Sequence, residues 1–157
     1  MPKYNTNFIQ TVSGSASTVT QQLSLTTGAG RRAAIYDFFA ALAATVPATN
    51  AQISARVFGV SALTAGAAVV PVNLDQIGGA ASTTTSSSTP TAVTTSGLAL
   101  IELDYSSFAT VRWTAWDADS RIVIPSGGGT GGEVASQNLQ YSAVAGLSVS
   151  HVIYFME

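Results

Sequence analysis

The amino-acid sequence predicts an all-β protein, a single-domain antiparallel β-sandwich of jelly-roll-like type with seven to eight strands and an N-terminal arm. Short stretches in which apolar and polar residues alternate recur roughly 8 to 12 residues apart, with turn residues between them. A length of 157 residues fits one hydrophobic core. Only 9% of the residues are charged, so Ser, Thr, Asn and Gln supply most of the polarity. We divide the chain into an arm, residues 1–16, and a β-sandwich domain, residues 17–157.

The first residues are polar, with Tyr4, Phe8 and Ile9 as isolated apolar anchors. This pattern is typical of an arm or a peripheral strand. The segment STVTQQLSL at residues 17–25 then alternates in polarity, which predicts a half-buried strand. The glycines at residues 28 and 30 end it.

The alanine-rich segment at residues 31–44 fits two structures. A helical stripe would consist of Ile35, Phe38, Phe39 and Leu42. One face of a strand would consist of Tyr36, Phe38, Ala40 and Leu42. Alanine favours helix, so the local rules slightly favour a helix over residues 33–43. Pro47 and the following Thr49-Asn50 then predict a turn.

The middle of the chain contains one clear strand and two segments of small residues. Residues 52–60 carry Ile, Val and Phe with polar residues between them, which predicts a strand. Residues 61–81 are mostly small, with one apolar piece at residues 69–74. Residues 82–96 read STTTSSSTPTAVTTS, which is too polar for a core, so we expect an extended surface connection or a mobile loop.

Strands return in the second half of the chain, at residues 98–105, 108–116, 121–125, 133–143 and 147–155. In the second of these, Trp113 and Trp116 lie on opposite faces, so we expect one to be in the core and the other to be exposed. The aspartates of Asp117-Ala118-Asp119-Ser120 predict a turn before the third.

Composition excludes several classes of function. The net charge is −2 with only six Lys and Arg, so the chain lacks the basic stripe that nucleic-acid binding requires. The absence of cysteine excludes disulfides and thiolate chemistry, and a single histidine excludes a site built on several imidazoles. The N-terminus has no apolar run typical of a signal peptide, and no segment is apolar and long enough to span a membrane.

The glycine-rich stretch SGGGTGGEV at residues 126–134 satisfies G-x-G-x-x-G and the first half of a P-loop. Glu133 and Val134 stand where a P-loop needs Lys and then Ser or Thr. The following residues resemble a strand, whereas a dinucleotide site needs a helix whose N-terminus binds the pyrophosphate. We therefore interpret the stretch as a loop between strands.

The candidate catalytic and metal-binding residues are few. Asp117 and Asp119, with Glu102 and Asp104 nearby in sequence, could begin a calcium site or supply paired carboxylates for glycoside hydrolysis. The EF-hand spacing is absent, so a turn in which aspartates accept backbone hydrogen bonds is the favoured interpretation. His151 lies among apolar residues and is expected to be buried or at an interface. We expect no catalytic residue, no cofactor and no metal.

Two features suggest contacts with a partner. An exposed Trp116 could stack on a sugar or fill a pocket of another protein. The pair Arg31-Arg32 could bind acidic groups of another subunit, although ordinary solvated charge explains it equally well.

A large part of the chain resembles small structural proteins of tailed bacteriophages. In that family an R-x-x-I-Y-D motif leads a strand, an A-T-x-P-A-x-N-A turn follows, a strand ends near R-V or R-F, and a Thr/Ala/Gly stretch reaches P-x-x-L-D. The matching residues here are Arg32, Ile35, Tyr36, Asp37, Ala44, Thr45, Pro47, Ala48, Asn50, Ala51, Arg56, Val57, Pro71, Leu74 and Asp75. The later segments FATVRW (108–113), IVIP (122–125) and FME (155–157) are also similar to the family.

The resemblance implies a capsid decoration (cement) protein, a symmetric and often trimeric β-sandwich bound to the outside of the phage head. It also implies that residues 33–43 form a strand. The implied partners are the major capsid protein and further copies of the chain, with Tyr4, Phe8, Ile9, Arg31, Arg32 and Trp116 as candidate interface residues. The implied location is the outer surface of the virion, after synthesis in the host cytoplasm. The alternative is a carbohydrate- or receptor-binding β-sandwich of a phage tail or fibre.

Overall fold

The computed structural model has 13 strands and no helix in the part of the chain that it describes, residues 1–12, 15–43, 49–75, 79–126, 132–144 and 146–157. The strands are β1 (Lys3–Thr11), β2 (Thr18–Thr26), β3 (Ala33–Leu42), β4 (Gln52–Thr64), β5 (Ala67–Val69), β6 (Val72–Asn73), β7 (Thr85–Ser88), β8 (Thr91–Thr95), β9 (Ile101–Ser106), β10 (Val111–Thr114), β11 (Ile122–Ile124), β12 (Glu133–Gln140) and β13 (Ser148–Met156). The all-β prediction is confirmed. The prediction of seven to eight strands was too low, because residues 1–16 and 61–96 add β1 and β5 to β8.

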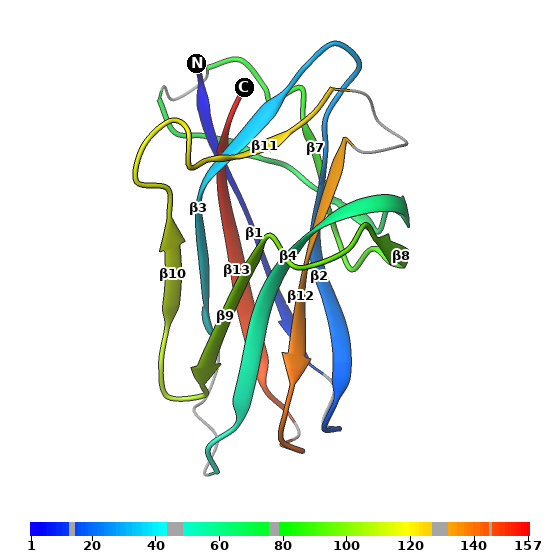
Figure 1. Ribbon diagram of the computed structural model, residues 1–157, viewed down its shortest axis with the longest axis vertical. Helices are drawn as coiled ribbons and strands as arrows, with labels where there is room; N and C mark the ends of the chain where they lie inside the picture. The colour runs from blue at the N-terminus through cyan, green and yellow to red at the C-terminus, as the bar shows by residue number, and fades with distance from the viewer. Residues whose placement is uncertain (13–14, 44–48, 76–78, 127–131, 145) are drawn as a thin grey trace.

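The strands form two antiparallel sheets that face each other, as in a β-sandwich (Figure 1). The six-stranded sheet has the order β10-β3-β13-β1-β6, and β11 also pairs with β3. The seven-stranded sheet has the order β5-β7-β2-β12-β4-β8, and β9 also pairs with β4. Both termini lie at the upper end of the view in Figure 1.

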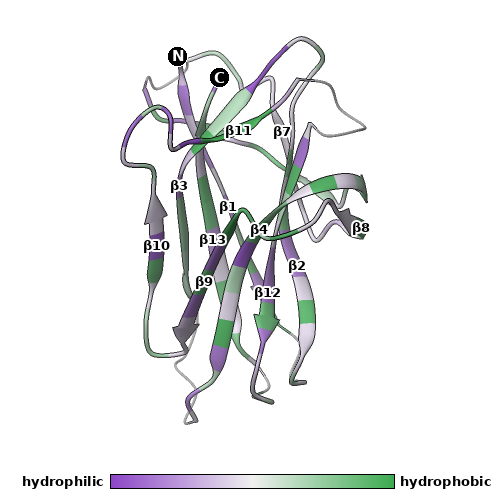
Figure 2. Ribbon diagram, viewed as in Figure 1, coloured by the Kyte–Doolittle hydropathy of each residue, from purple (hydrophilic) through white to green (hydrophobic). Residues whose placement is uncertain are grey.

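The hydrophobic core lies between the sheets. Alternation along β4 directs Ile53, Ala55 and Val57 inward, where all three are fully buried. Phe38 and Ile153 of the other sheet belong to the same buried cluster. Figure 2 shows this alternation as hydrophobic and hydrophilic segments that succeed each other along β4. Burial of this surface is the main stabilising contribution, at about 25 cal/mol per Å² of apolar area.

The predicted N-terminal arm is largely a strand of the six-stranded sheet. Nine residues of β1 pair with β13, from Lys3 opposite Met156 to Thr11 opposite Ser148. Its inward side chains include Thr6, whose hydroxyl lies 2.8 Å from that of Ser86 in the other sheet. The alternation was missed because some inward positions of β1 are polar and their hydrogen bonds are made across the sandwich.

Residues 33–42 form a strand, so the helix that local rules favoured over residues 33–43 was wrong and the strand implied by the family resemblance was right. β3 pairs with β13 on one side and with β10 and β11 on the other. Most of its side chains on both faces are buried, which hides the period-two signal of a strand. Pairing on both sides outweighs the helix preference of alanine, which is worth less than about 1 kcal/mol per residue.

The Ser/Thr tract at residues 82–96 contains two paired strands, β7 and β8. The expected surface connection or mobile loop was wrong for β7, which is largely buried, whereas β8 is an exposed strand at the edge of its sheet. Ser86, Ser87 and Ser88 of β7 are each no more than 6% exposed. Their hydroxyls have partners; for example, that of Ser87 lies 2.7 Å from the hydroxyl of Ser24. Hydrogen bonding removes the penalty of burying these groups, and their small size suits a crowded site.

The seven-stranded sheet curls strongly at one end. Only Ala65 and Gly66 separate β4 from β5, although β5 lies at the opposite edge of that sheet. The upper part of β4 accordingly sweeps away from β12 toward the side where β8 lies (Figure 1). In the connection between β4 and β5, the amide of Gly66 donates a hydrogen bond to the Ser87 hydroxyl over 3.2 Å. A side chain at Gly66 would overlap the carbonyl of Ser88, so this connection requires glycine.

Candidate interaction surfaces

The structure buries one of the candidate interface residues. Tyr4 is only 1% exposed and stacks on Phe155, with 5.5 Å between ring centroids. Its hydroxyl donates to the carbonyl of Ala80 over 3.2 Å. Tyr4 is therefore a core residue in this chain, because the even positions of β1 face the other sheet.

The other candidates on β1 differ from each other. Phe8 is partly buried and packs against the core. Ile9 points the other way and is 57% exposed. Only Ile9 of the three N-terminal candidates therefore offers a large exposed apolar surface.

Arg31 and Arg32 are both exposed in the turn between β2 and β3. The turn is made by Gly30, whose φ is 73°, and by a hydrogen bond from the Arg31 amide to the carbonyl of Gly28 over 3.2 Å. Neither guanidinium forms an ion pair with a carboxylate among the described residues. Both charges are thus available to solvent or to an acidic partner.

The prediction for the two tryptophans is confirmed. Trp113, in β10, packs against the core, whereas Trp116, just after β10, is 96% exposed. The segment after Trp116 is fixed by Asp117, whose Oδ1 accepts the amides of Asp119 and Ser120 over 3.0 and 2.9 Å. These hydrogen bonds lower the pKa of Asp117. The interpretation of this segment as a turn is therefore confirmed, with Asp117 as the carboxylate that accepts its backbone hydrogen bonds.

The candidate interface residues do not gather at one place. Ile9 pairs with Ser150, near the start of β13. Arg31 and Arg32 precede Ala34, which pairs with Met156 at the end of β13. The two groups therefore lie at opposite ends of the six-stranded sheet, and sequence reasoning did not find the surface between them.

That surface is the face of the six-stranded sheet that points away from the core, here called the outer face. The pairing registers arrange it in three rows across the strands. The first row is Val72, Asn5, Tyr154, Asp37 and Thr114; the second is Asn7, Val152, Phe39 and Arg112; the third is Ile9, Ser150 and Ala41. Tyr36 adds a ring 6.1 Å from that of Tyr154. The outer face is therefore mostly neutral, with aromatic and aliphatic side chains at its centre.

The charge in these rows is paired. Arg112 forms an ion pair with Asp37, and its Nε lies 2.9 Å from Oδ1 of that carboxylate. The side chain of Asp37 is only 4% exposed, whereas that of Arg112 is 63% exposed. Asp37 also raises the pKa of Arg112, through their hydrogen bond and then through its charge. Arg112 therefore neutralises the charge of Asp37, whose carboxylate lies on the outer face.

The single histidine lies between the two sheets and is fully buried. Its Nε2 is 2.9 Å from Oδ1 of Asn138, which can only accept, so Nε2 carries the proton. Its Nδ1 is 3.0 Å from the hydroxyl of Ser136, which in turn accepts the amide of Leu23. Burial lowers the pKa of His151 to about 3, so the ring is neutral at physiological pH. The prediction of a buried histidine is confirmed.

Two further carboxylates have structural partners. Glu102 forms an ion pair with Arg56, and Glu133 is buried within 3.4 Å of the Thr26 hydroxyl. The described residues contain no cluster of three or more acidic or histidine side chains arranged to bind a metal. The glycine-rich loop at residues 127–131 lies outside the described residues, but the strand predicted after it is confirmed as β12.

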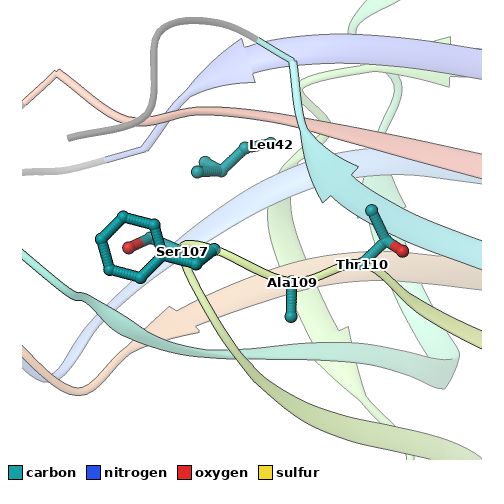
Figure 3. Close-up of a pocket in the computed structure, with 5 residues that line it drawn as sticks. Leu42, Ser107, Ala109 and Thr110 are labelled. Carbon is teal, nitrogen blue, oxygen red and sulfur yellow. The ribbon is translucent and has the colours of Figure 1, made fainter.

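A small pocket of about 170 Å³ lies where the end of β3 meets the segment between β9 and β10. Its lining is Leu42, Ser107, Phe108, Ala109 and Thr110 (Figure 3). The lining contains no titratable group, and its polar side chains are the two hydroxyls of Ser107 and Thr110. Ser107 already uses its hydroxyl as an acceptor for the Ala51 amide, over 3.0 Å. The pocket lacks the convergent polar groups that orient a small-molecule ligand.

Comparisons with protein-family models, with curated proteins and with solved structures found no match. Among the described residues there is no helix of the length and hydrophobicity needed to cross a membrane.

Proposed function

We propose that this chain is a capsid decoration protein of a tailed bacteriophage, which binds the outer surface of the head and stabilises the shell by bridging capsomers. The proposed partners are the major capsid protein and further copies of the chain in a homotrimer. The function is structural and needs no catalytic residue. The proposal starts from the family resemblance and is supported by three features of the structure.

The feature that carries the proposal is the outer face of the six-stranded sheet. It presents Phe39 of β3 beside Val152 of β13, with Tyr154 two residues further along β13. The charged neighbours, Arg112 and Asp37, neutralise each other in an ion pair. A broad, neutral, partly apolar surface suits contact with another protein better than capture of a small ligand, which needs a concave site. These three side chains are partly exposed, and a contiguous group of partly exposed apolar side chains supports an interaction site.

The second supporting feature is the way polar residues stiffen the interior. His151 joins the two sheets through Ser136 and Asn138, and Thr6 joins them through Ser86. Hydrogen bonds with fixed geometry resist sliding of one sheet over the other more than apolar contacts do. A shell-bridging protein under internal pressure requires such resistance. Because these groups are engaged and buried, they support a structural role in preference to a catalytic one.

The third supporting feature is the low charge of the chain. Only 9% of residues are charged, and hydroxyls and amides supply most of the remaining polarity. Neutral polar groups are cheaper to remove from water than charges, so a surface of this kind can be covered by neighbours at small electrostatic cost.

The test is cosedimentation of the purified chain with expanded heads of the phage that encodes it. We expect saturable binding to the heads, and decorated heads should resist heat or chelator better than bare heads. Trimers should be seen by analytical ultracentrifugation. Failure to cosediment over a micromolar range of concentrations would overturn the proposal.

A matched pair of variants tests the outer face. Val152→Lys places a charge at the centre of the outer face, and Val19→Lys places one on the opposite sheet, where Val19 is 44% exposed. Burying an unpaired charge in an interface is costly, so Val152→Lys should weaken head binding at least tenfold and Val19→Lys should not. Equal binding by both variants would remove the outer face from the proposal.

One observation favours a second function, binding of carbohydrate or of a receptor by a tail or fibre module. Trp116 is 96% exposed, and exposed tryptophan stacks well on sugar rings. Glycan-array binding that is lost in Trp116→Ala, without any association with heads, would favour this function over decoration. Head binding that survives Trp116→Ala would favour decoration.

A further inference from the structure

One edge of the six-stranded sheet is incomplete. β13 pairs with the full length of β1 on one side, but on the other side β6 pairs only with Tyr4 and Asn5. On that side the carbonyl of Lys3 accepts the amide of Leu74 over 2.8 Å. Backbone groups alternate in direction along a strand, so those of the odd positions Asn7, Ile9 and Thr11 also point to this side. No described residue forms a backbone hydrogen bond with them there.

This open edge lacks the features that keep edge strands from pairing. Soluble proteins protect such edges with Lys, Pro, bulges or short strands. Residues 6–11 read TNFIQT, without charge or proline, and their pairing with β13 continues without a bulge. Ile9 is 57% exposed at the centre of the open segment. An edge of this kind is stable in solution only if another strand covers it or if it is used transiently.

We propose that the open edge pairs with the same edge of a second copy of this chain, antiparallel about a twofold axis at Ile9. In this register Ile9 faces its own copy, and Asn7 faces Thr11 of the second copy. The three facing pairs would each exchange two backbone hydrogen bonds. The two six-stranded sheets then form one continuous sheet.

The length of the open segment supports this register. The pairing with β6 stops at Asn5, and β1 ends at Thr11, just before the buried Val12. Residues 7–11 are therefore free, and a twofold axis at the middle residue is the antiparallel register that uses all of them. A shift by two residues would bring the second copy against β6 and leave fewer pairs.

Charge supports a second copy as the occupant. A twofold axis brings identical residues together, so a charged residue near the axis would face its own like charge. The open segment carries none, and it offers an aliphatic pair at the axis with amide and hydroxyl groups on either side. Five paired residues form a contact smaller than the interface of a stable dimer, so it is weak in solution and gains strength where copies are held side by side.

This inference goes beyond the proposed function and does not depend on it. If the chain decorates a shell as trimers, the twofold contact would join copies that belong to neighbouring trimers. Loss of head binding and loss of strand pairing are measured in different experiments, so either can fail alone.

Disulfide trapping tests the pairing, because the chain contains no cysteine. The Ile9→Cys variant places two thiols opposite each other across the axis, about 5.5 Å apart between Cα atoms for a hydrogen-bonded pair, which is within the range of a disulfide. The control is Val123→Cys on β11, since Val123 is 56% exposed and Ile9 is 57% exposed. We expect Ile9→Cys to form covalent dimers at least ten times faster than the control under mild oxidation.

The register is tested by mixing two further variants. Asn7→Cys should react slowly with itself and at least tenfold faster with Thr11→Cys, because those positions face each other across the axis. Circular dichroism confirms that each variant is folded. Equal rates for Ile9→Cys and Val123→Cys would overturn the pairing, and self-reaction of Asn7→Cys as fast as the mixture would overturn the register.

Discussion

Protonation of His151 should lower the free energy of unfolding of the chain by several kcal/mol. The ring is fully buried, accepts a hydrogen bond at Nδ1 and packs edge-on against Phe38, with 5.1 Å between ring centroids. Burial lowers its pKa from 6.5 to about 3. A charged imidazolium would have to be held between two sheets in a site with no described carboxylate hydrogen-bonded to it.

The sign follows from where the proton binds. Between pH 6.5 and about 3 the unfolded chain binds a proton at His151 and the folded chain does not. The free energy of unfolding therefore falls as the pH falls through this window, by about 1.4 kcal/mol per pH unit. From pH 6.5 to 4.5 the loss is about 3 kcal/mol, a large part of the 5 to 15 kcal/mol typical of a domain.

The assay is denaturant unfolding of the wild-type chain and of His151→Gln at pH 7.5 and pH 4.5. Glutamine keeps a donor and an acceptor but does not titrate, so the variant should lose about 3 kcal/mol less than the wild type between these pH values. Groups that titrate in both proteins cancel in this difference. A direct control is the NMR titration of the single histidine, which should show no protonation of the folded chain above pH 4.

Two results would refute the reasoning. The first is an equal pH dependence of unfolding in the wild type and His151→Gln. The second is an imidazole resonance that titrates near pH 6.5 in the folded protein, and this measurement remains decisive even if the variant does not fold.

Three further substitutions probe local features. Burial alone would raise the pKa of Glu157, but its hydrogen bonds lower the pKa to about 2. Glu157→Gln should therefore lower the melting temperature at pH 7 and have progressively less effect as the pH falls from 4.5 toward 2. Thermal melts of both proteins across this range check that the two melting temperatures approach each other. Gly66→Ala should destabilise the chain by about 1 to 3 kcal/mol, because the added side chain would overlap a carbonyl. In the control Gly28→Ala the added carbon would lie 3.6 Å from its nearest neighbour, so this change should cost less than about 1 kcal/mol. Equal unfolding midpoints of the two variants would contradict this. Ser87→Ala should cost about 1 to 3 kcal/mol in chemical denaturation, because it leaves the Gly66 amide and a buried hydroxyl without their partner.

The sequence was sufficient for the fold class and for the long amphipathic strands. β2, β12 and β13 were predicted close to their observed bounds, and β4 was predicted from its correct start but continues to Thr64. Alternating polarity along the sequence identified these strands, although β12 is buried on both faces. The opposite environments of the two tryptophans, the buried His151 and the aspartate turn after β10 also followed from local patterns.

Other elements depend on contacts that local patterns do not record. β1 and β7 place Thr6 and Ser86 in the interior, where each hydroxyl satisfies the other across the sandwich. β3 is buried on both faces, so alanine propensity and period were poor guides. The outer face depends on the registers of five strands, and its rows join residues as distant in sequence as Asn5 and Tyr154.

The measurement that tests the central claim most directly is the occupancy of phage heads by this chain, determined by cryo-electron microscopy of expanded heads incubated with the purified protein. The proposal predicts β-sandwich density on the outer shell surface, with the face carrying Val152 in contact with the capsid or with a neighbouring copy, and lower occupancy with Val152→Lys at the same concentration. Bare heads at saturating concentrations of a folded wild-type chain would contradict it.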